Sequence, residues 1–322
     1  MRRTVAALGI VAALVAGALA SSTRAAASAP QAPAAARGQA STPAAFDGAK
    51  AFEHLKQVVA IGPRPSGSPE LRETRAYITH QLASIGLTVQ EQRFIGETPR
   101  GPVDMVNLIV RLPGRRADRI VIGGHYDTKP IAGMRFVGAS DGASSAAFLV
   151  ELARALKGRP HDLTYELVWF DGEEAVCRGW DDCGKPGSPD NTYGSRFYVQ
   201  AAKKAGALPS LKTMILVDMI GADGLILRRE TKSTAWLTDT IWNTARRLAY
   251  GHVFVDASLP VEDDHLPFLE AGVPSVDLID LQDYPYWHTA DDTLAHVSAR
   301  SLQIVGDVLI AALPEIDAKL AR

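Results

Sequence analysis

The stretch LTYELVWF at residues 163–170 is predominantly apolar and runs directly into the acidic turn Asp171-Gly172-Glu173-Glu174. A strand with so little polar alternation is typical of a sheet that is buried on both faces. A second run of this kind, TMILVDMI at residues 213–220, carries a single acid, Asp218. The two runs therefore predict the centre of a sheet that helices cover on both sides.

Helices and strands are expected to alternate along the rest of the chain. Apolar residues at helical spacing occur in the segments Phe46–Ile61, Ser68–Ile85, Ala143–Lys157, Asn191–Ala205, Thr234–Ala249, Asp264–Ala271 and Ser298–Leu313. Further strand-like segments are Leu87–Phe94, Met105–Leu112, Arg119–Gly124 and Ser275–Ile279. The dipeptide Pro113-Gly114 predicts a hairpin between its two flanking strands. The pattern predicts an α/β fold, a three-layer sandwich whose mixed, mostly parallel central sheet has helices on both faces.

The composition narrows the class of protein. The 322 residues are 47% hydrophobic and 22% charged, with a formal net charge of −2. Such a chain is not a disordered protein, a collagen or a coiled coil. It has no basic excess, so we expect no binding of nucleic acid through phosphate neutralisation. The one long apolar run lies at the N-terminus, so we expect no membrane span in the body of the chain.

The N-terminus predicts export. Residues 1–20 combine an arginine pair, a short apolar run and small residues, which is typical of a secretory signal peptide; a permanent anchor is the alternative. Residues 21–44 are rich in Ala, Pro and Ser and predict a linker. Residues 45–322 are then expected to form a single catalytic domain that is periplasmic or secreted and free of the membrane.

Export determines how the two cysteines are interpreted. Cys177 and Cys183 lie in one loop rich in Gly, Asp and Pro, and the chain has no other cysteine. In an oxidising compartment such a pair favours a local disulfide over free thiols. Two sulfurs without a neighbouring histidine do not favour a metal site.

Acidic and imidazole side chains follow the predicted strands at their carboxyl ends. These residues are His125, Asp141, Glu173, Glu174, Asp218 and His288. Ligands of α/β sheets bind beyond the carboxyl ends of the strands, so these side chains are expected to converge. Carboxylates and imidazoles are the ligand set of a catalytic zinc ion that keeps one position open.

A nucleophilic serine is a competing interpretation of one segment. Residues 138–142, GASDG, fit the G-x-S-x-G pattern of serine hydrolases. That pattern requires a strand directly before it, whereas residues 129–137 contain Pro130 and Gly133. The metal site is therefore the preferred interpretation.

Seven motifs together resemble the zinc aminopeptidase superfamily, and within it the glutaminyl cyclases. They are GGHYDT (123–128), GASDGASS (138–145), FDGEEA (170–175), YGSR (193–196), DMIG (218–221), EDDHLPFLEAGVP (262–274) and WHTADDT (287–293). The resemblance runs from about residue 46 to the C-terminus. It implies the aminopeptidase-like α/β sandwich that the strand pattern also predicts.

The resemblance implies one of two metal arrangements. In the cyclases one zinc ion is held by the residues that match Asp141, Glu174 and His288, while those matching Glu173 and Asp218 serve the chemistry. In the dinuclear aminopeptidases two metals are held by this set with Asp218 and His125 as additional ligands. All of these residues are present here, so the ligands alone do not separate the two branches.

Two residues favour the cyclase branch. Asp263 matches an acid that the cyclases use together with Asp218, and Trp287 matches an aromatic wall of their substrate pocket. His265 is expected to add a hydrogen bond in the pocket. The animal cyclases place a tryptophan shortly after the glutamate pair; here Trp180 has a different spacing, and Tyr284 or Tyr286 is the candidate for a further aromatic.

The resemblance implies a glutaminyl-peptide cyclotransferase that acts on the N-termini of peptides or proteins, as a monomer. Glu173 would take a proton from the α-amine and later deliver it to the departing ammonia. Asp218 and Asp263 would share a proton and hold the leaving nitrogen. The alternative is a di-zinc aminopeptidase, in which Glu173 would activate water instead.

Overall fold

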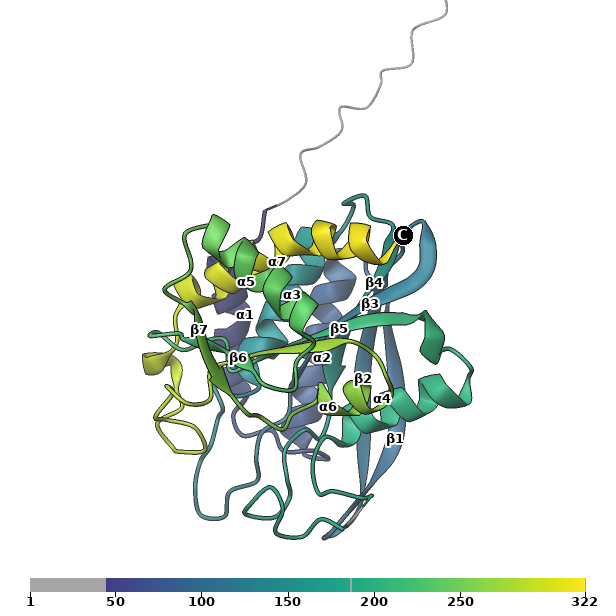
Figure 1. Ribbon diagram of the computed structural model, residues 1–322. Helices are drawn as coiled ribbons and strands as arrows, with labels where there is room; N and C mark the ends of the chain where they lie inside the picture. The colour runs from purple at the N-terminus through teal and green to yellow at the C-terminus, as the bar shows by residue number, and fades with distance from the viewer. Residues whose placement is uncertain (1–44, 186, 322) are drawn as a thin grey trace, which may run out of the picture. The chain divides into compact units, whose positions relative to one another are not determined.

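The computed structural model describes residues 45–185 and 187–321, which belong to one compact unit. The predicted signal peptide and linker lie outside the described residues. The helices are α1 (Gly48–Ile61), α2 (Pro69–Ser84), α3 (Ala143–Leu156), α4 (Tyr193–Lys204), α5 (Ala235–Arg247), α6 (Leu266–Glu270) and α7 (Ala299–Leu320). The strands are β1 (Val89–Thr98), β2 (Gly101–Leu112), β3 (Arg116–His125), β4 (Leu163–Phe170), β5 (Leu211–Asp218), β6 (Leu227–Glu230), β7 (Phe254–Leu259) and β8 (Ser275–Ile279) (Figure 1).

Six strands form the central sheet in the order β1-β2-β4-β3-β5-β8. β2 pairs antiparallel with both β1 and β4. β3 pairs parallel with both β4 and β5, and β5 pairs parallel with β8. The sheet is therefore mixed, and its parallel half carries β3, β4 and β5 side by side. The carboxyl ends of these three strands meet at one edge, where the predicted site residues begin.

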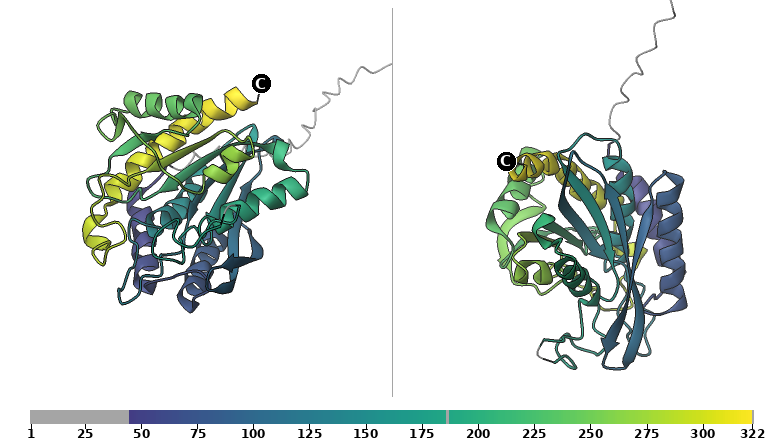
Figure 2. Two further views of the ribbon diagram at one scale, coloured as in Figure 1. Left: turned by 60° about the horizontal axis from the view of Figure 1, so that its bottom comes forward. Right: turned by 90° about the vertical axis from the view of Figure 1, so that its right-hand side faces the viewer.

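Side chains of β4 alternate between two apolar layers, which explains the continuous apolar run. Tyr165, Leu167 and Trp169 belong to the core that α1, α2, α3, α5 and α7 complete. Val168 and Phe170 point to the opposite core, which α4 and α6 cover. A strand buried on both faces needs apolar residues at odd and even positions alike. Figure 2 shows the sheet between its helices, so the predicted three-layer α/β sandwich is confirmed.

The hairpin predicted at Pro113-Gly114 is wrong. β4 lies between β2 and β3, and the true hairpin joins β1 to β2 through the pair Thr98 and Gly101. Gly114 instead passes so close to the start of β4 that a Cβ atom there would lie 2.5 Å from the carbonyl carbon of Leu163. Glycine at position 114 therefore allows two backbone segments to approach closely. In the sequence, such a glycine cannot be distinguished from the glycine of a turn.

Two further differences concern short or interrupted elements. β6 and β7 form a separate parallel pair that the sequence did not predict, because each is short and β7 is largely exposed. α7 continues through Pro314 to Leu320, beyond the predicted end at Leu313. A proline inside a helix removes one hydrogen bond, and the buried side chain of Ile316 keeps the last turns packed on the core. Within the part of the chain that the structure describes, no helix has the length and apolar character needed to span a bilayer.

Candidate metal centre and active site

The site is assembled from segments that follow the parallel strands. His125 ends β3, Glu173 and Glu174 lie in the loop after β4, and Asp218 ends β5. Asp141 lies just before α3, in the long loop after β3. The loops that follow β3 and β4 lie together at the lower edge of the view in Figure 1. The parallel register thus brings residues from distant parts of the sequence to one place.

Asp141, Glu174 and His288 form the first group of potential metal ligands. His288 Nε2 lies 3.3 Å from Asp141 Oδ2 and 3.2 Å from Glu174 Oε1. Burial alone would lower the pKa of His288, but Glu174 and Asp141 raise it to about 10. The distances place the three side chains around one point, and the two carboxylates favour positive charge there.

His125, Asp141 and Asp218 form a second, deeper group. His125 Nε2 lies 3.2 Å from Asp141 Oδ1 and 3.1 Å from Asp218 Oδ1. Burial acts to lower the pKa of His125, but the carboxylates, led by Asp218, raise it well above its usual value. Asp141 is thus common to both groups, with one oxygen directed to each.

The donor atoms of the first group fit a divalent ion. In each group the ligand atoms lie within 4.8 Å of one another. Asp141 Oδ2 is buried and accepts no hydrogen bond from any described residue, and Glu174 Oε1 faces the same imidazole nitrogen of His288. Buried carboxylate oxygens are costly unless a donor or a cation satisfies them. Together with the imidazole, they form a donor set that suits a divalent metal.

A fully buried arginine, Arg64, holds the loop that presents Asp141. Its guanidinium donates to the carbonyl oxygens of Tyr126, Val137 and Gly138 at 2.9, 2.6 and 3.2 Å, and it lies 3.5 Å from the carbonyl oxygen of Asp141. Burial lowers the pKa of Arg64 to about 10, so it stays protonated at neutral pH. The sequence analysis missed this residue, and a lone arginine beside two prolines gave no signal.

Two further acids that the sequence analysis missed also hold the site. Asp292 accepts the backbone N–H groups of Ser140 and Asp141 at 2.8 and 3.1 Å. Asp127 lies 3.4 Å from Nδ1 of His125 and accepts the N–H groups of Glu173 and Glu174. Carboxylates that fix the far nitrogen of a metal-binding histidine orient the ring. The sequence feature that could have indicated this role of Asp127 is its position two residues after His125, at the end of a strand.

Backbone strain is concentrated at the site. His288 has φ = 53° and Met219, directly after Asp218, has φ = 48°. Residues other than glycine rarely adopt the left-handed region, and strain of this kind gathers at functional sites. The N–H of Met219 donates to Asp218 Oδ1 at 2.7 Å, which fixes that carboxylate.

Replacing Arg64 tests the support of the Asp141 loop. In the Arg64→Met variant several buried carbonyl groups lose their donor, so we expect the free energy of unfolding to fall by about 3–5 kcal/mol. Urea unfolding in excess chelator measures this without a contribution from metal. Arg72→Met is the matched control, because Arg72 is exposed and makes one bond, to Gly67. Equal stability of the two variants would contradict the role of Arg64.

A cavity of about 400 Å³ opens onto the first ligand group. Asp141, Glu174 and His288 line it, together with Glu173, Asp218 and Asp263. Its walls include an apolar set, Met219, Val261, Ile279, Leu281, Trp180 and Trp287. Trp287 is 45% exposed and its ring stacks on His288 with a centroid distance of 4.2 Å. Trp287 therefore lies at the cavity rather than in the core.

Glu173 lies beside the ligands but belongs to neither group. It is buried, and its Oε2 is 3.8 Å from His125 Nδ1. Burial raises the pKa of Glu173 well above its usual value, and Glu174 and Asp263 add to the rise against the opposing effect of His125. A carboxylate with a raised pKa, directed into a cavity, is suited to proton transfer.

Asp263 belongs to a cluster of buried acids behind the cavity. Burial and the neighbouring Asp277 and Asp218 raise the pKa of Asp263 well above its usual value. Its Oδ2 has no hydrogen-bond partner among the described residues. Two neighbouring carboxyl groups repel each other least when only one of them is ionised. We therefore expect a protonated Asp263 beside an ionised Asp218.

Two predicted pocket residues do not line the cavity. His265 is fully buried, with Nε2 3.2 Å from Glu230 Oε2 and Nδ1 3.7 Å from Asp277 Oδ2. Tyr284 is buried as well, and its hydroxyl donates to Asp292 at 2.5 Å. Tyr284 therefore helps to hold Asp292, which binds the loop that carries Asp141. His265 lies among the buried acids.

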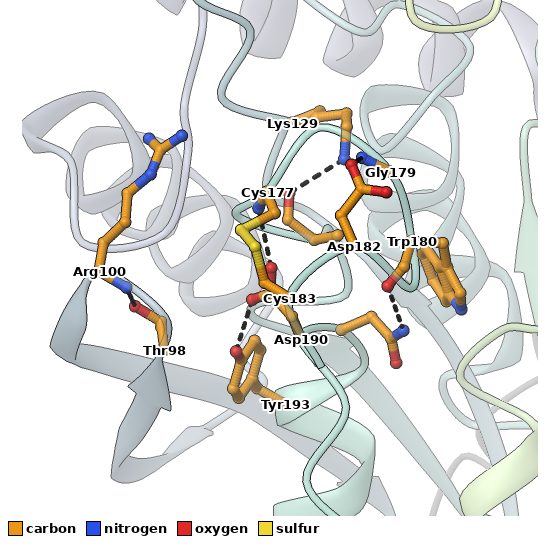
Figure 3. Close-up of a disulfide and its surroundings, with 12 residues drawn as sticks. Thr98, Arg100, Lys129, Cys177, Gly179, Trp180, Asp182, Cys183, Asp190 and Tyr193 are labelled. Atoms are coloured by element: carbon orange, nitrogen blue, oxygen red, sulfur yellow. Dashed lines mark hydrogen bonds between the residues drawn. A yellow bond between two sulfur atoms is a disulfide. The ribbon is translucent and has the colours of Figure 1, made fainter. Parts of the chain in front are cut away.

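The predicted disulfide is present between Cys177 and Cys183. Figure 3 shows the loop that it closes, with Trp180 at the end of the loop away from Arg100. Asp190 accepts the N–H of Cys177 at 2.8 Å and the hydroxyl of Tyr193 at 2.7 Å, which ties the loop to the start of α4. The disulfide and this anchor together hold Trp180 at the cavity wall.

The structure offers no support for the serine interpretation. Ser140 lies in the loop before α3, and no strand precedes it among residues 126–140. Its Oγ is buried and has no hydrogen-bond partner among the described residues, so no base reaches it. A serine nucleophile requires an adjacent base.

Comparison with known proteins agrees with this geometry. The sequence profile of peptidase family M28 matches residues 107–313. A glutaminyl-peptide cyclotransferase-like protein from Mus musculus is 30% identical over 281 residues, which cover 78% of this chain and 72% of the relative.

Two solved structures extend the likeness to the fold. The glutaminyl cyclase of an Acidobacteriales bacterium is 36% identical, with a TM-score of 0.80 over 90% of this chain and 100% of that one. The glutaminyl cyclase of Fimbriiglobus ruber is 31% identical, with a TM-score of 0.75 over 84% of this chain and 95% of that one. The chain belongs to peptidase family M28, in its glutaminyl cyclase branch.

Proposed function

We propose that this protein is a zinc-dependent glutaminyl-peptide cyclotransferase, which converts the N-terminal glutamine of peptides to pyroglutamate and releases ammonia. The observation that carries the proposal is the position of Glu173, which lines the same small cavity as the ligand group Asp141, Glu174 and His288. The similarity to glutaminyl cyclases over most of the chain supports it.

The proposed metal is a single zinc ion on the first ligand group. All three residues of that group line the cavity, whereas His125 of the second group does not. A substrate in the cavity therefore has access to the first group. When bound there, zinc supplies a Lewis acid for the γ-carbonyl of the substrate glutamine.

The proton transfers fall to Glu173. It takes a proton from the substrate α-amine as the nitrogen forms a bond to the carbonyl carbon of the glutamine side chain. It then gives this proton to the amide nitrogen, whose bond to the same carbon breaks, and ammonia leaves. One carboxylate serves both steps, because the proton that it accepts is the proton that it returns.

Asp218 and Asp263 are proposed to hold the leaving nitrogen. Both line the cavity, and Asp218 contributes to the raised pKa of Asp263. Two carboxyl groups that share one proton can accept a hydrogen bond from the side-chain amide of the substrate glutamine and donate one to it. Trp180 and Trp287 are proposed to flank the glutamine side chain.

The proposal extends to the location of the protein. We place it outside the cytoplasm, with residues 1–20 as the signal peptide, residues 21–44 as the linker and residues 45–322 as one catalytic domain that acts as a monomer. The disulfide supports this location, because such bonds persist in oxidising compartments.

One experiment separates this function from that of a di-zinc aminopeptidase, which the second ligand group favours. The purified protein is offered a glutamine-initiated and a leucine-initiated peptide, and the metal content per chain is measured by mass spectrometry. We expect ammonia from the glutamine peptide and one zinc ion. Free leucine and two zinc ions would overturn the proposal.

A further inference from the structure

A second cavity, of about 430 Å³, lies beside the active-site cavity and has a different charge. Lys129, Arg178 and His288 line both cavities, so the two adjoin at the ligand His288. Arg100 adds a third cation to the second cavity, whose other walls are the apolar side chains of residues 130–134. Among the described residues that line it there is no aspartate or glutamate.

The two arginines of this cavity are not neutralised by the protein. In the described parts of the chain, the guanidinium groups of Arg100 and Arg178 have no hydrogen-bond or ion-pair partner, and both residues are exposed. Figure 3 shows the Arg100 side chain extended away from the strand that carries Thr98. Lys129 is buried, donates to the carbonyl oxygen of Ala175 at 3.0 Å and lies 3.8 Å from Glu174 Oε2.

A third cavity, on the other side of Trp180, has mixed charge, and two of the three cations that line it have partners. There Lys232 bonds Glu262 at 3.2 Å, and Arg196 donates to the carbonyl oxygens of Pro189 and Asn191. The third cavity also contains Asp181, Glu262, Asp263 and Glu270, so a cationic lining without carboxylates distinguishes the cavity on the Arg100 side. The protein as a whole is slightly acidic, with 34 basic and 36 acidic residues, so this concentration of charge is local.

From this arrangement we infer that Arg100, Lys129 and Arg178, here called the basic shelf, select peptides with a carboxylate directly after the N-terminal glutamine. The inference rests on the proposed function, which places the glutamine in the acidic cavity. An extended peptide advances about 3.3–3.6 Å per residue. The second residue therefore leaves the first cavity next to His288, where the shelf begins.

The chemistry of the shelf suits a carboxylate. Its two free guanidinium groups present paired N–H donors that match the two oxygens of a carboxylate. The acidic active-site cavity attracts the substrate amine, so the charges of the site complement a peptide that is positive at its N-terminus and negative at the next residue. The carboxylate belongs either to an aspartate or glutamate side chain or to the C-terminus of a dipeptide.

The test compares kcat/KM of the zinc-loaded protein for four substrates. These are Gln-Ala-Ala-amide, Gln-Glu-Ala-amide, Gln-Lys-Ala-amide and the free acid Gln-Ala. Because exposed ion pairs contribute modestly, we expect the glutamate peptide to exceed the lysine peptide by about three- to tenfold at low salt. The difference should shrink as salt rises from about 0.05 to 0.5 M. A preference for Gln-Ala over Gln-Ala-Ala-amide assigns the carboxylate to the C-terminus, and a preference for the glutamate peptide alone assigns it to the side chain.

Charge reversal at the shelf gives the decisive comparison. The Arg100→Glu/Arg178→Glu variant should prefer the lysine peptide over the glutamate peptide, which reverses the order of the unmodified protein. Arg115→Glu is the control, because Arg115 lies before β3, at the opposite end of the sheet, and should leave the order unchanged. Equal rates for the glutamate and lysine peptides, or an order that survives the double reversal, would overturn the inference. Failure to cyclise any of the glutamine peptides would instead overturn the proposed function.

Discussion

Glu173→Gln is expected to lower kcat for a glutamine-initiated peptide by about 10²- to 10⁴-fold, which is the contribution of a positioned general acid–base group. The substitution keeps the shape of the side chain but removes its capacity to accept a proton. Glu173 contributes no atom to either ligand group, so the zinc content of the variant should equal that of the unmodified protein. Steady-state ammonia release and metal analysis of the same preparation measure both quantities.

Glu262→Gln is the matched control for this variant. Glu262 also lines the cavity, but its side chain is 56% exposed and pairs with Lys232. Its loss should leave kcat nearly unchanged. If Glu173→Gln retains full turnover, Glu173 has no part in the proton transfers. If it loses zinc as well as turnover, Glu173 contributes to metal binding.

The layers of the fold could be predicted from the sequence because burial on two faces leaves a local signature. The observed bounds of β4 and β8 equal the predicted ones, since both strands are buried along their whole length. The order of the strands has no such signature. Nothing local to Pro113-Gly114 indicates that β4, fifty residues later, inserts beside β2.

The ligand candidates could also be predicted, because each follows or ends an apolar strand or precedes a helix. The residues that hold the ligands in place could not. Arg64 acts through backbone carbonyl groups, and any buried donor of that length could in principle do so. Asp292 acts through two N–H groups of a loop some 150 residues away in the chain. Such contacts depend on the tertiary fold and not on local sequence.

His288→Ala and His125→Ala are expected to separate the two ligand groups. His288 belongs only to the first group and His125 only to the second, while Asp141 belongs to both. With one zinc ion on the first group, Asp141→Ala, Glu174→Ala and His288→Ala should each lose zinc. His125→Ala should retain it. Loss of a supporting contact alone costs about 10- to 100-fold in metal affinity, so removal of a ligand should cost more.

Thermal unfolding gives a second readout of the same prediction that does not depend on turnover. A metal present at about 1,000 times its Kd stabilises the folded state by about 4 kcal/mol, because it binds the folded chain alone. Chelation should therefore lower the Tm of the unmodified protein and of His125→Ala. It should not lower the Tm of His288→Ala, which has no zinc to lose. If all three first-group variants kept their zinc, the assignment would fail. If His125→Ala halved a content of two zinc ions, the second group would also hold metal, and the dinuclear arrangement of the aminopeptidases would apply to this chain.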